Sequence, residues 1–258
     1  MYMRLVSMKL KPDASFEGRQ FYEQRVLAQL REMEGCLYAT LTTNVQRPTE
    51  CVSLTLWDSQ AHAEAYQQGG TYGRLVQEAN PYLAEAAEWK VELSEDLTLE
   101  YKAVREEPIL TSYSLQAGMG GESLGEMQHD VNHLRVVRLQ IQPGKLEEVR
   151  ELYSDAILPA LRSVAGCRYA FLMGNVAARN ELVSITIWDS RADAETYERS
   201  GQFQQLLRKV RHTLPGAYHW KMVLETKYGG QAFSSADVKV ESYAVVARAS
   251  FKQAPVKN

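Results

Sequence analysis

Two arginines stand in segments that otherwise have the alternating pattern of buried strands, Arg4 near the N-terminus and Arg135 in the middle of the chain. A charged side chain is seldom buried without a partner. Each arginine therefore predicts one of two arrangements. One is a structural ion pair with a carboxylate such as Glu92 or Glu225. The other is a cation that faces a ligand, where it can stabilise an anionic oxygen such as that of a phenolate.

Aromatic side chains could form the walls of such a ligand pocket, since small-molecule sites are mostly apolar with a few polar groups. The competing interpretation is that they are core residues with a polar tip at the surface. The candidate catalytic residues include Arg135 and Tyr197. Together with Arg4, the candidate substrate-binding residues are Tyr22, Trp57, Tyr66, Tyr72, Tyr153, Trp188 and Phe203.

Histidines supply two further catalytic candidates, because His133 and His219 could act as general bases. His129 and His133 have the spacing of metal ligands on a helix. They lie where a linker meets a strand, however, so their side chains would not converge, and we expect no metal site. No glycine-rich phosphate loop opens a helix, and no Ser-His-Asp or Cys-His set can be assembled from the spacing. The three cysteines are too few and too scattered for a disulfide framework, and we expect inert packing.

These candidates fall in two copies of one segment, at a constant offset along the chain. Gly35-Cys36-Leu37-Tyr38-Ala39 matches Gly166-Cys167-Arg168-Tyr169-Ala170, and Trp57-Asp58-Ser59 matches Trp188-Asp189-Ser190. No insertion or deletion is needed over residues 4–93. We therefore expect a first unit at 1–95, a second unit at 132–226, and two further segments. These are a connector at 96–131, with strand character and a Gly-rich part, and a C-terminal strand and tail at 227–258.

Each copy predicts the element order β-α-β-β-α-β. A strand is followed by a helix that a glycine ends; two strands, a helix capped by Asp-Ser and a fourth strand follow. In the first copy the fourth strand carries Trp89, Val91 and Leu93. This is the α+β, ferredoxin-like unit, whose helices cover only one sheet face.

Two such units can stack their bare sheet faces into a pseudo-dimeric α+β barrel within one chain. A further homodimer of such barrels is compatible with this arrangement. The segments after each repeat could lie across the other unit as clasps.

The Trp-Asp-Ser sequence, followed by an Ala/Glu-rich turn, a Tyr and then a Tyr or Phe (Tyr66 and Tyr72; Tyr197 and Phe203), resembles the antibiotic biosynthesis monooxygenase (ABM) family. The resemblance covers both repeats and implies a dimeric α+β barrel. It also implies several activities, among them cofactor-independent oxidation of quinols or polycyclic phenols and degradation of haem.

In the haem-degrading branch, an Asn on the first strand, a Trp on the second helix and a following His form the working set. This chain has Ser7 or Arg138 near the first position and Tyr66 or Tyr197 at the second. The histidine position falls near Val76 or Leu207. The haem-degrading reaction is therefore not expected.

A cofactor-free oxygenase needs an apolar pocket for an electron-rich aromatic substrate that donates electrons to O2 once deprotonated. We expect such a monooxygenase with no cofactor; the alternative is a non-catalytic, stress-related or small-molecule-binding protein of the same fold. If one copy is active, both histidines and the apolar Phe171-Leu172-Met173 favour the second.

The net charge of −3 and the lack of a basic stripe argue against nucleic-acid binding. The chain has no long apolar run and no apolar signal-peptide core at its start, so we expect a cytoplasmic protein without membrane segments.

Overall fold

The computed structural model describes residues 1–93, 99–105, 107–119, 131–215 and 238–251, with the backbone alone over 86–93 and 99–105. The first unit has the predicted strand and helix order. Its elements are β1 (Tyr2–Lys9), α1 (Ser15–Phe21), η1 (Tyr22–Val26), α2 (Leu27–Arg31), β2 (Cys36–Asn44), β3 (Glu50–Trp57), α3 (Gln60–Gln68), α4 (Thr71–Ala79), η2 (Asn80–Tyr82) and β6 (Ile109–Met119).

The second unit repeats this order element by element. Its elements are β7 (His133–Gln140), α5 (Leu146–Leu152), η4 (Tyr153–Ile157), α6 (Leu158–Arg162), β8 (Cys167–Asn175), β9 (Glu181–Trp188), α7 (Arg191–Arg199), α8 (Gln202–Val210), η5 (Arg211–Thr213) and β10 (Val238–Ser250). The two β-α-β-β-α-β units expected from the repeat are therefore present.

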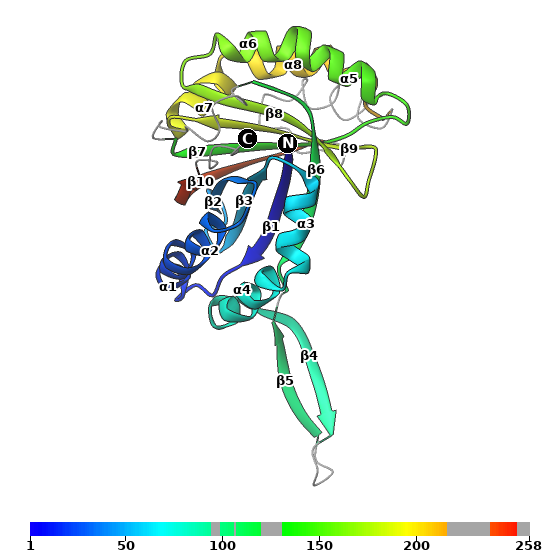
Figure 1. Cartoon of the computed structure of the whole chain (residues 1–258). Coiled ribbons are helices and arrows are strands. Elements are labelled where there is room, and N and C mark those ends of the chain that lie inside the picture. The colour runs from blue at the N-terminus through cyan, green and yellow to red at the C-terminus, as the bar shows by residue number, and fades with distance from the viewer. Residues whose placement is uncertain (94–98, 106, 120–130, 216–237, 252–258) are drawn as a thin grey trace, which may run out of the picture.

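The strands form one closed barrel in the order β1-β3-β2-β10-β7-β9-β8-β6, all neighbours antiparallel. The helices of each unit lie outside the barrel, over their own strands (Figure 1). Closure leaves no unpaired sheet edge within the barrel. The predicted pseudo-dimeric α+β barrel is confirmed.

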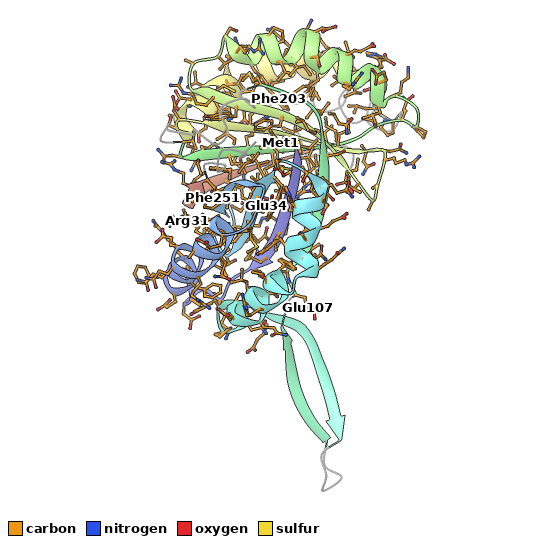
Figure 2. The ribbon with its side chains drawn as sticks, viewed as in Figure 1. Met1, Arg31, Glu34, Glu107, Phe203 and Phe251 are labelled. Atoms are coloured by element: carbon orange, nitrogen blue, oxygen red, sulfur yellow. The ribbon has the colours of Figure 1, made fainter. Side chains whose placement is uncertain are left out.

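The predicted fourth strand of the first unit is a strand, but it does not join the barrel. Residues Glu85–Leu93 form β4, which pairs only with β5 (Leu99–Arg105) in a separate two-stranded sheet that projects from the barrel. In Figure 2, Glu107 lies where this hairpin joins the barrel. The place beside β1 is taken by β6, which pairs with both β1 and β8. Because β6 is hydrogen-bonded on both sides, it closes the barrel. The chain leading into β4, by contrast, separates from β1 after the single Leu10–Leu83 bridge.

In the second unit, the predicted fourth strand around Trp220 lies outside the described residues. Its place beside β7 belongs to β10, which pairs with β7 and with β2 of the first unit. The segments that follow the repeats therefore join the two units, as the clasp interpretation anticipated. The two strands, β6 and β10, also occupy equivalent places in the barrel. Tyr113 of β6 opposes Met3 and Asn175, and Tyr243 of β10 opposes Leu134 and Asn44, which are the matched residues of the two copies.

Alternation along the strands divides the buried residues into three clusters. The barrel interior holds side chains from both units, including Met3, Leu54, Phe171 and Ile185. The outer face of each half-barrel packs against its own helices in two separate clusters. Trp57 and Trp188 belong to these outer clusters and are 0% exposed, which confirms the interpretation of these two aromatics as core residues.

The local signals of the sequence act as expected. Ser59 and Ser190 cap the helices α3 and α7, each accepting a hydrogen bond from a backbone N–H three residues ahead at 3.2 Å. Gly35 has a φ of 74°, and a Cβ at this residue would lie 2.1 Å from the His62 ring. Only glycine therefore fits the turn that leads from α2 to β2.

Burial raises the pKa of each cysteine thiol, Cys36, Cys51 and Cys167, to about 12. These thiols therefore stay protonated near neutral pH, in line with the packing role predicted for them. Among the described helices, none is both long and apolar enough to cross a membrane.

Candidate functional site

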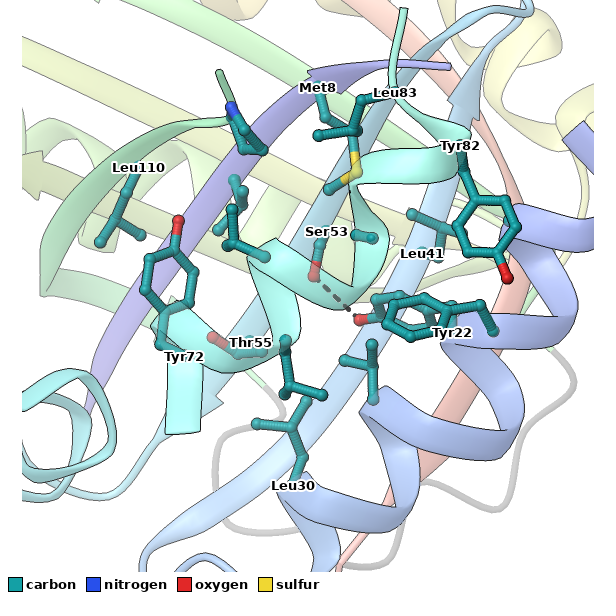
Figure 3. Close-up of a pocket in the computed structure, with 18 of the residues that line it drawn as sticks. Met8, Tyr22, Leu30, Leu41, Ser53, Thr55, Tyr72, Tyr82, Leu83 and Leu110 are labelled. Atoms are coloured by element: carbon teal, nitrogen blue, oxygen red, sulfur yellow. Dashed lines mark hydrogen bonds between the residues drawn. The ribbon is translucent and has the colours of Figure 1, made fainter. Parts of the chain in front are cut away.

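A cavity of about 80 Å³ lies between the first unit's helices and the outer face of its sheet (Figure 3). Its walls are mostly aliphatic and aromatic. The residues that line it include Arg4, Gly18, Tyr22, Leu30, Leu41, Ser53, Thr55, Tyr66, Tyr72, Leu75, Val76, Ala79, Tyr82 and Leu110. Leu110 belongs to β6, so the connector supplies part of the wall.

The first helix changes to a π-turn at Tyr22, the first residue of η1, and the equivalent π-turn η4 begins at Tyr153. Such turns occur often at functional sites. Each tyrosine reaches the sheet: the Tyr22 and Ser53 hydroxyls are 2.9 Å apart, and those of Tyr153 and Ser184 are 3.0 Å apart. Figure 3 shows the first of these bonds crossing the cavity.

Tyr66 and Tyr72 form a second aromatic wall, their ring centroids 6.0 Å apart in an edge-to-face arrangement. Burial raises the pKa of Tyr22, Tyr66 and Tyr72 above that of an ordinary phenol. All three are therefore neutral at physiological pH and can donate a hydrogen bond but not accept a proton as a base. None of the described residues that line this cavity is a carboxylate or a histidine.

Arg4 is the one cationic residue among those lining this cavity, and it is 4% exposed. It lies on β1, on the strand face that points toward α3. Its Nη1 donates to the Ala63 carbonyl oxygen at 2.8 Å, and Nη2 donates to the Gln67 side-chain oxygen. Its Nε is buried and has no hydrogen-bond partner.

The second unit has an equivalent cavity of about 50 Å³, lined among others by Arg135, Tyr153, Tyr197 and Phe203. Matched residues explain why it is smaller. Gly18, Val26, Val76 and Ala79 of the first cavity correspond to Val149, Ile157, Leu207 and Val210 of the second, each a larger side chain. Two larger residues of the first unit, Phe21 and Tyr82, contact each other with ring centroids 5.4 Å apart.

Arg135 is held differently from Arg4. Its Nε donates to Glu198 Oε1 at 2.5 Å, and its guanidinium carbon lies 4.0 Å from the centroid of the Phe203 ring. Figure 2 marks Phe203 on the helical side of the second unit. Of the two predicted arrangements, Arg135 adopts the ion pair, with Glu198; the predicted partner Glu225 lies outside the described residues. Among the described side chains, Arg4 has no carboxylate partner; the side chain of its predicted partner Glu92 lies outside them.

The structure brings most of the predicted residues together, but as two sets. Arg4, Tyr22, Tyr66 and Tyr72 line the first cavity, and Arg135, Tyr153, Tyr197 and Phe203 line the second. Trp57 and Trp188 line neither. They pack behind Tyr66 and Tyr197, at centroid distances of 5.4 and 5.3 Å, and their ring N–H groups donate to Thr55 and Thr186.

Of the two histidine candidates, the structure describes only His133, which lines neither cavity. His133 is buried on β7 outside the second cavity, and burial, together with nearby Arg191, lowers its pKa. His219 lies outside the described residues. Within the described part of the chain, no group of three His, Cys, Asp or Glu side chains is placed to hold a metal ion.

Most lining residues of the first cavity were absent from the sequence-based set, among them Ser53, Thr55 and Gly18. The first two could have been found, because Ser184 and Thr186 occupy the same places in the second copy and interrupt an otherwise apolar strand. The signal at Gly18 is the opposite one: the two copies carry different residues there, and the difference in side-chain size changes the volume of the cavity.

Structures similar to this one cover nearly the whole chain. A candidate monooxygenase from Lactobacillus acidophilus is 7% identical, with a TM-score of 0.63, and the match covers 96% of this chain and 95% of that one. One from Fusobacterium nucleatum is 10% identical, with a TM-score of 0.64 and coverage of 96% and 94%. An anthrone oxidase-like protein is 13% identical, with a TM-score of 0.56 and coverage of 96% and 92%. At these identities the likeness shows the fold alone.

No curated protein matches the sequence. The family described as antibiotic biosynthesis monooxygenase matches residues 1–78 and again residues 133–209, together more than half of the chain. The matches cover most of the strands and helices that build the two cavities; β6, which supplies Leu110, lies outside them. The chain therefore belongs to the antibiotic biosynthesis monooxygenase family, with two copies of the domain in one barrel.

Proposed function

We propose that this protein binds a small aromatic molecule in the cavity of the first unit and oxidises it with O2. The observation that carries this proposal is the first cavity itself, an apolar space with aromatic walls and a few polar groups, as small-molecule sites have. A cavity of about 80 Å³ is several times the ~10–15 Å³ that one water needs. The family and the monooxygenase-type neighbours support an oxygenase.

The first unit is the better candidate of the two, in contrast to the preference for the second unit drawn from its histidines. The second cavity is smaller, and larger side chains fill it at four matched positions. Its histidine candidates are not among the described residues that line it. The second unit therefore serves as the structural partner that completes the barrel.

The chemistry follows from the polar groups of the cavity. Since its tyrosines stay neutral, they can hold an oxygen of the substrate by hydrogen bonds, and the substrate must supply the electrons. In its deprotonated form a quinol or anthrone-type phenol can pass electrons to O2. For a quinol oxidised to a hydroxyquinone, one oxygen atom of O2 enters the ring and the other leaves as water with two hydrogens of the quinol, which supplies all four electrons. The cavity size favours a single-ring substrate over a polycyclic one.

A binding protein without catalysis is the second candidate. The observation that favours it is that no described residue lining the first cavity can act as a general base. An oxygenase would then depend on substrate that ionises in solution or under the influence of the cavity.

Oxygen uptake by the purified, flavin- and metal-free protein tests the proposal, with a panel of hydroquinones, naphthols and anthrones. We expect uptake above the uncatalysed rate for at least one single-ring quinol. Tyr66→Phe should slow it by roughly 10- to 1000-fold, the scale for losing one donor to a reacting oxygen. The matched control Tyr197→Phe makes the same change in the second unit and should leave the rate unchanged.

If no compound raises oxygen uptake but aromatic compounds still bind, the protein is a binder. If Tyr197→Phe and not Tyr66→Phe slows the reaction, the assignment to the first unit is wrong.

A further inference from the structure

The two units differ in the charge beside their cavities. Arg4 and Arg135 are equivalent and nearly fully buried, at 4% and 2% exposure. The residue that meets each guanidinium from the second helix is Gln67 in the first unit and Glu198 in the second, also equivalent positions. The exchange of an amide for a carboxylate therefore leaves one arginine with its full charge and neutralises the other.

Among the described side chains, the surroundings of Arg4 offer no substitute for Glu198. The carboxylate of Glu64 acts on Arg4 through space. This carboxylate accepts a hydrogen bond from Gln60 at 2.7 Å. The direct partners of Arg4 are the Ala63 carbonyl and the Gln67 amide, both neutral. Arg4 Nε and Arg135 Nη2 are both buried without a hydrogen-bond partner, so the two units differ in the counter-charge and not in an unused donor.

A buried cation without a counter-ion is costly, because the charge has lost its water. Burial lowers the pKa of Arg4, the same physical penalty in another form. An anionic group in the adjoining cavity would offset it and could accept the unused hydrogen bond. In the second unit the protein supplies that anion from its own chain; in the first it does not.

We propose that the first cavity binds its ligand as an anion, with one charged oxygen paired to Arg4, and that Glu198 takes the place of such an anion in the second unit. The inference rests on the proposed function in one respect, that the ligand occupies the first cavity. The expected ligand is a flat apolar molecule that carries one anionic group, either a phenolate or a carboxylate. Arg4 thus selects the ionised form directly, which suits a cavity without a base among its described residues.

The test is titration of the full-length protein with benzoate and benzyl alcohol, which are similar in shape and differ in charge. We expect benzoate to bind roughly 10- to 100-fold more tightly, the range for a hydrogen bond to a charged group. A third probe, 4-nitrophenol, becomes a yellow phenolate near neutral pH. If the cavity prefers phenolate, bound 4-nitrophenol should ionise at a lower pH than the free compound; this arm separates phenolate from carboxylate ligands.

Gln67→Glu is the decisive variant, since it gives the first unit the ion pair that the second unit already tolerates. The preference for benzoate over benzyl alcohol should collapse. Gln68→Glu, on the same helix at an exposed position, adds the same charge away from Arg4 and is the matched control. Glu198→Gln should leave the affinity of the first site unchanged, and thermal melts of all three variants check that they fold.

Each result has a definite reading. If benzyl alcohol binds the parent protein as tightly as benzoate and 4-nitrophenol, the anion inference is wrong while the proposed ligand cavity stands. The same holds if Gln67→Glu keeps the preference for benzoate. If none of the three probes binds, both the cavity proposal and the anion inference fail. If 4-nitrophenolate alone binds tightly and loses affinity in Gln67→Glu, the ligand is a phenolate.

Discussion

Filling the first cavity from Gly18 should stabilise the protein and abolish ligand binding together. Gly18 lies on α1 and lines the cavity, and the second unit has Val149 at the matched position. A Cβ on Gly18 would meet Leu10 Cδ1 at 3.4 Å and Tyr82 Cβ at 3.6 Å, which is ordinary van der Waals contact. The Cβ of Gly18→Val therefore fits without displacing the backbone.

Two routes give the size of the stability gain. Three added carbon atoms, at about 0.8 kcal/mol for each one buried, contribute at most about 2.4 kcal/mol. Removing a cavity of about 80 Å³, at about 24 cal/mol per Å³, gives about 2 kcal/mol. Replacing glycine in a helix adds a few tenths of a kcal/mol. Since the new side chain loses rotamer freedom, we expect a net gain of about 1–2 kcal/mol.

Urea unfolding measures the gain, and titration with benzoate measures the loss of binding, which should exceed about tenfold. Val149→Gly is the matched control: it should destabilise the protein and leave benzoate binding at the first site intact. A Gly18→Val protein that is less stable than the parent would refute the packing argument. One that binds benzoate with undiminished affinity would show that the ligand lies elsewhere.

Three further predictions concern the barrel. Trp57→Ala or Trp188→Ala should each lower the free energy of unfolding by roughly 3–5 kcal/mol in urea melts, and a much smaller loss would contradict their complete burial. Glu241, whose side chain is 7% exposed, contacts Lys239, Arg47 and Arg138 at 2.8, 3.2 and 3.5 Å. Burial acts to raise its pKa, but the hydrogen bonds from Lys239 and Tyr243 and the charges of Lys239 and Arg138 outweigh burial and hold the pKa below the ordinary value. Because the folded-state pKa of Glu241 is depressed, its stabilisation is present above the unfolded-state pKa and is lost as pH falls through the folded-state pKa. Glu241→Gln should therefore lower the free energy of unfolding by roughly 1–2 kcal/mol near neutral pH and leave it unchanged in acid. A fragment ending at Ser94 lacks β6 and the second unit and exposes the barrel interior; light scattering should show dimers or aggregates, and a stable monomer would contradict the shared barrel.

Much of the architecture could be predicted because both copies of the repeat carry the same local sequence signals. The Asp-Ser caps, the glycines after the first helices and the buried Trp57 and Trp188 all depend on neighbours close in sequence, and all were predicted correctly. The strand that follows the second helix was not. Residues 85–93 have a strand pattern and do form a strand, but the partner of β1 is β6. That choice depends on closing a barrel with β8, a contact that no local pattern encodes.

For the site, residue types were easier to predict than roles. Arg4 and Arg135 were singled out as equals because both copies keep them. Their difference depends on Gln67 and Glu198, which meet them from another element, and on Gly18 and Val149, which change the space beside them. Each of these differences is visible in the aligned repeats, but its importance appears only when the helix is placed on the sheet.

The last described strand has a consequence for the order in which the chain can fold. β10 joins β2 and β7, and Tyr243 opposes Asn44 across some 200 residues of intervening sequence. During synthesis, β2 therefore remains an open edge until β10, some 200 residues later, has left the ribosome. Pairings of such long sequence separation fold slowly, and a waiting edge can accept a strand from another nascent chain. The duplicated unit has thus exchanged a bimolecular assembly step for a late intramolecular one, and β2 stays exposed to such pairing until β10 is translated.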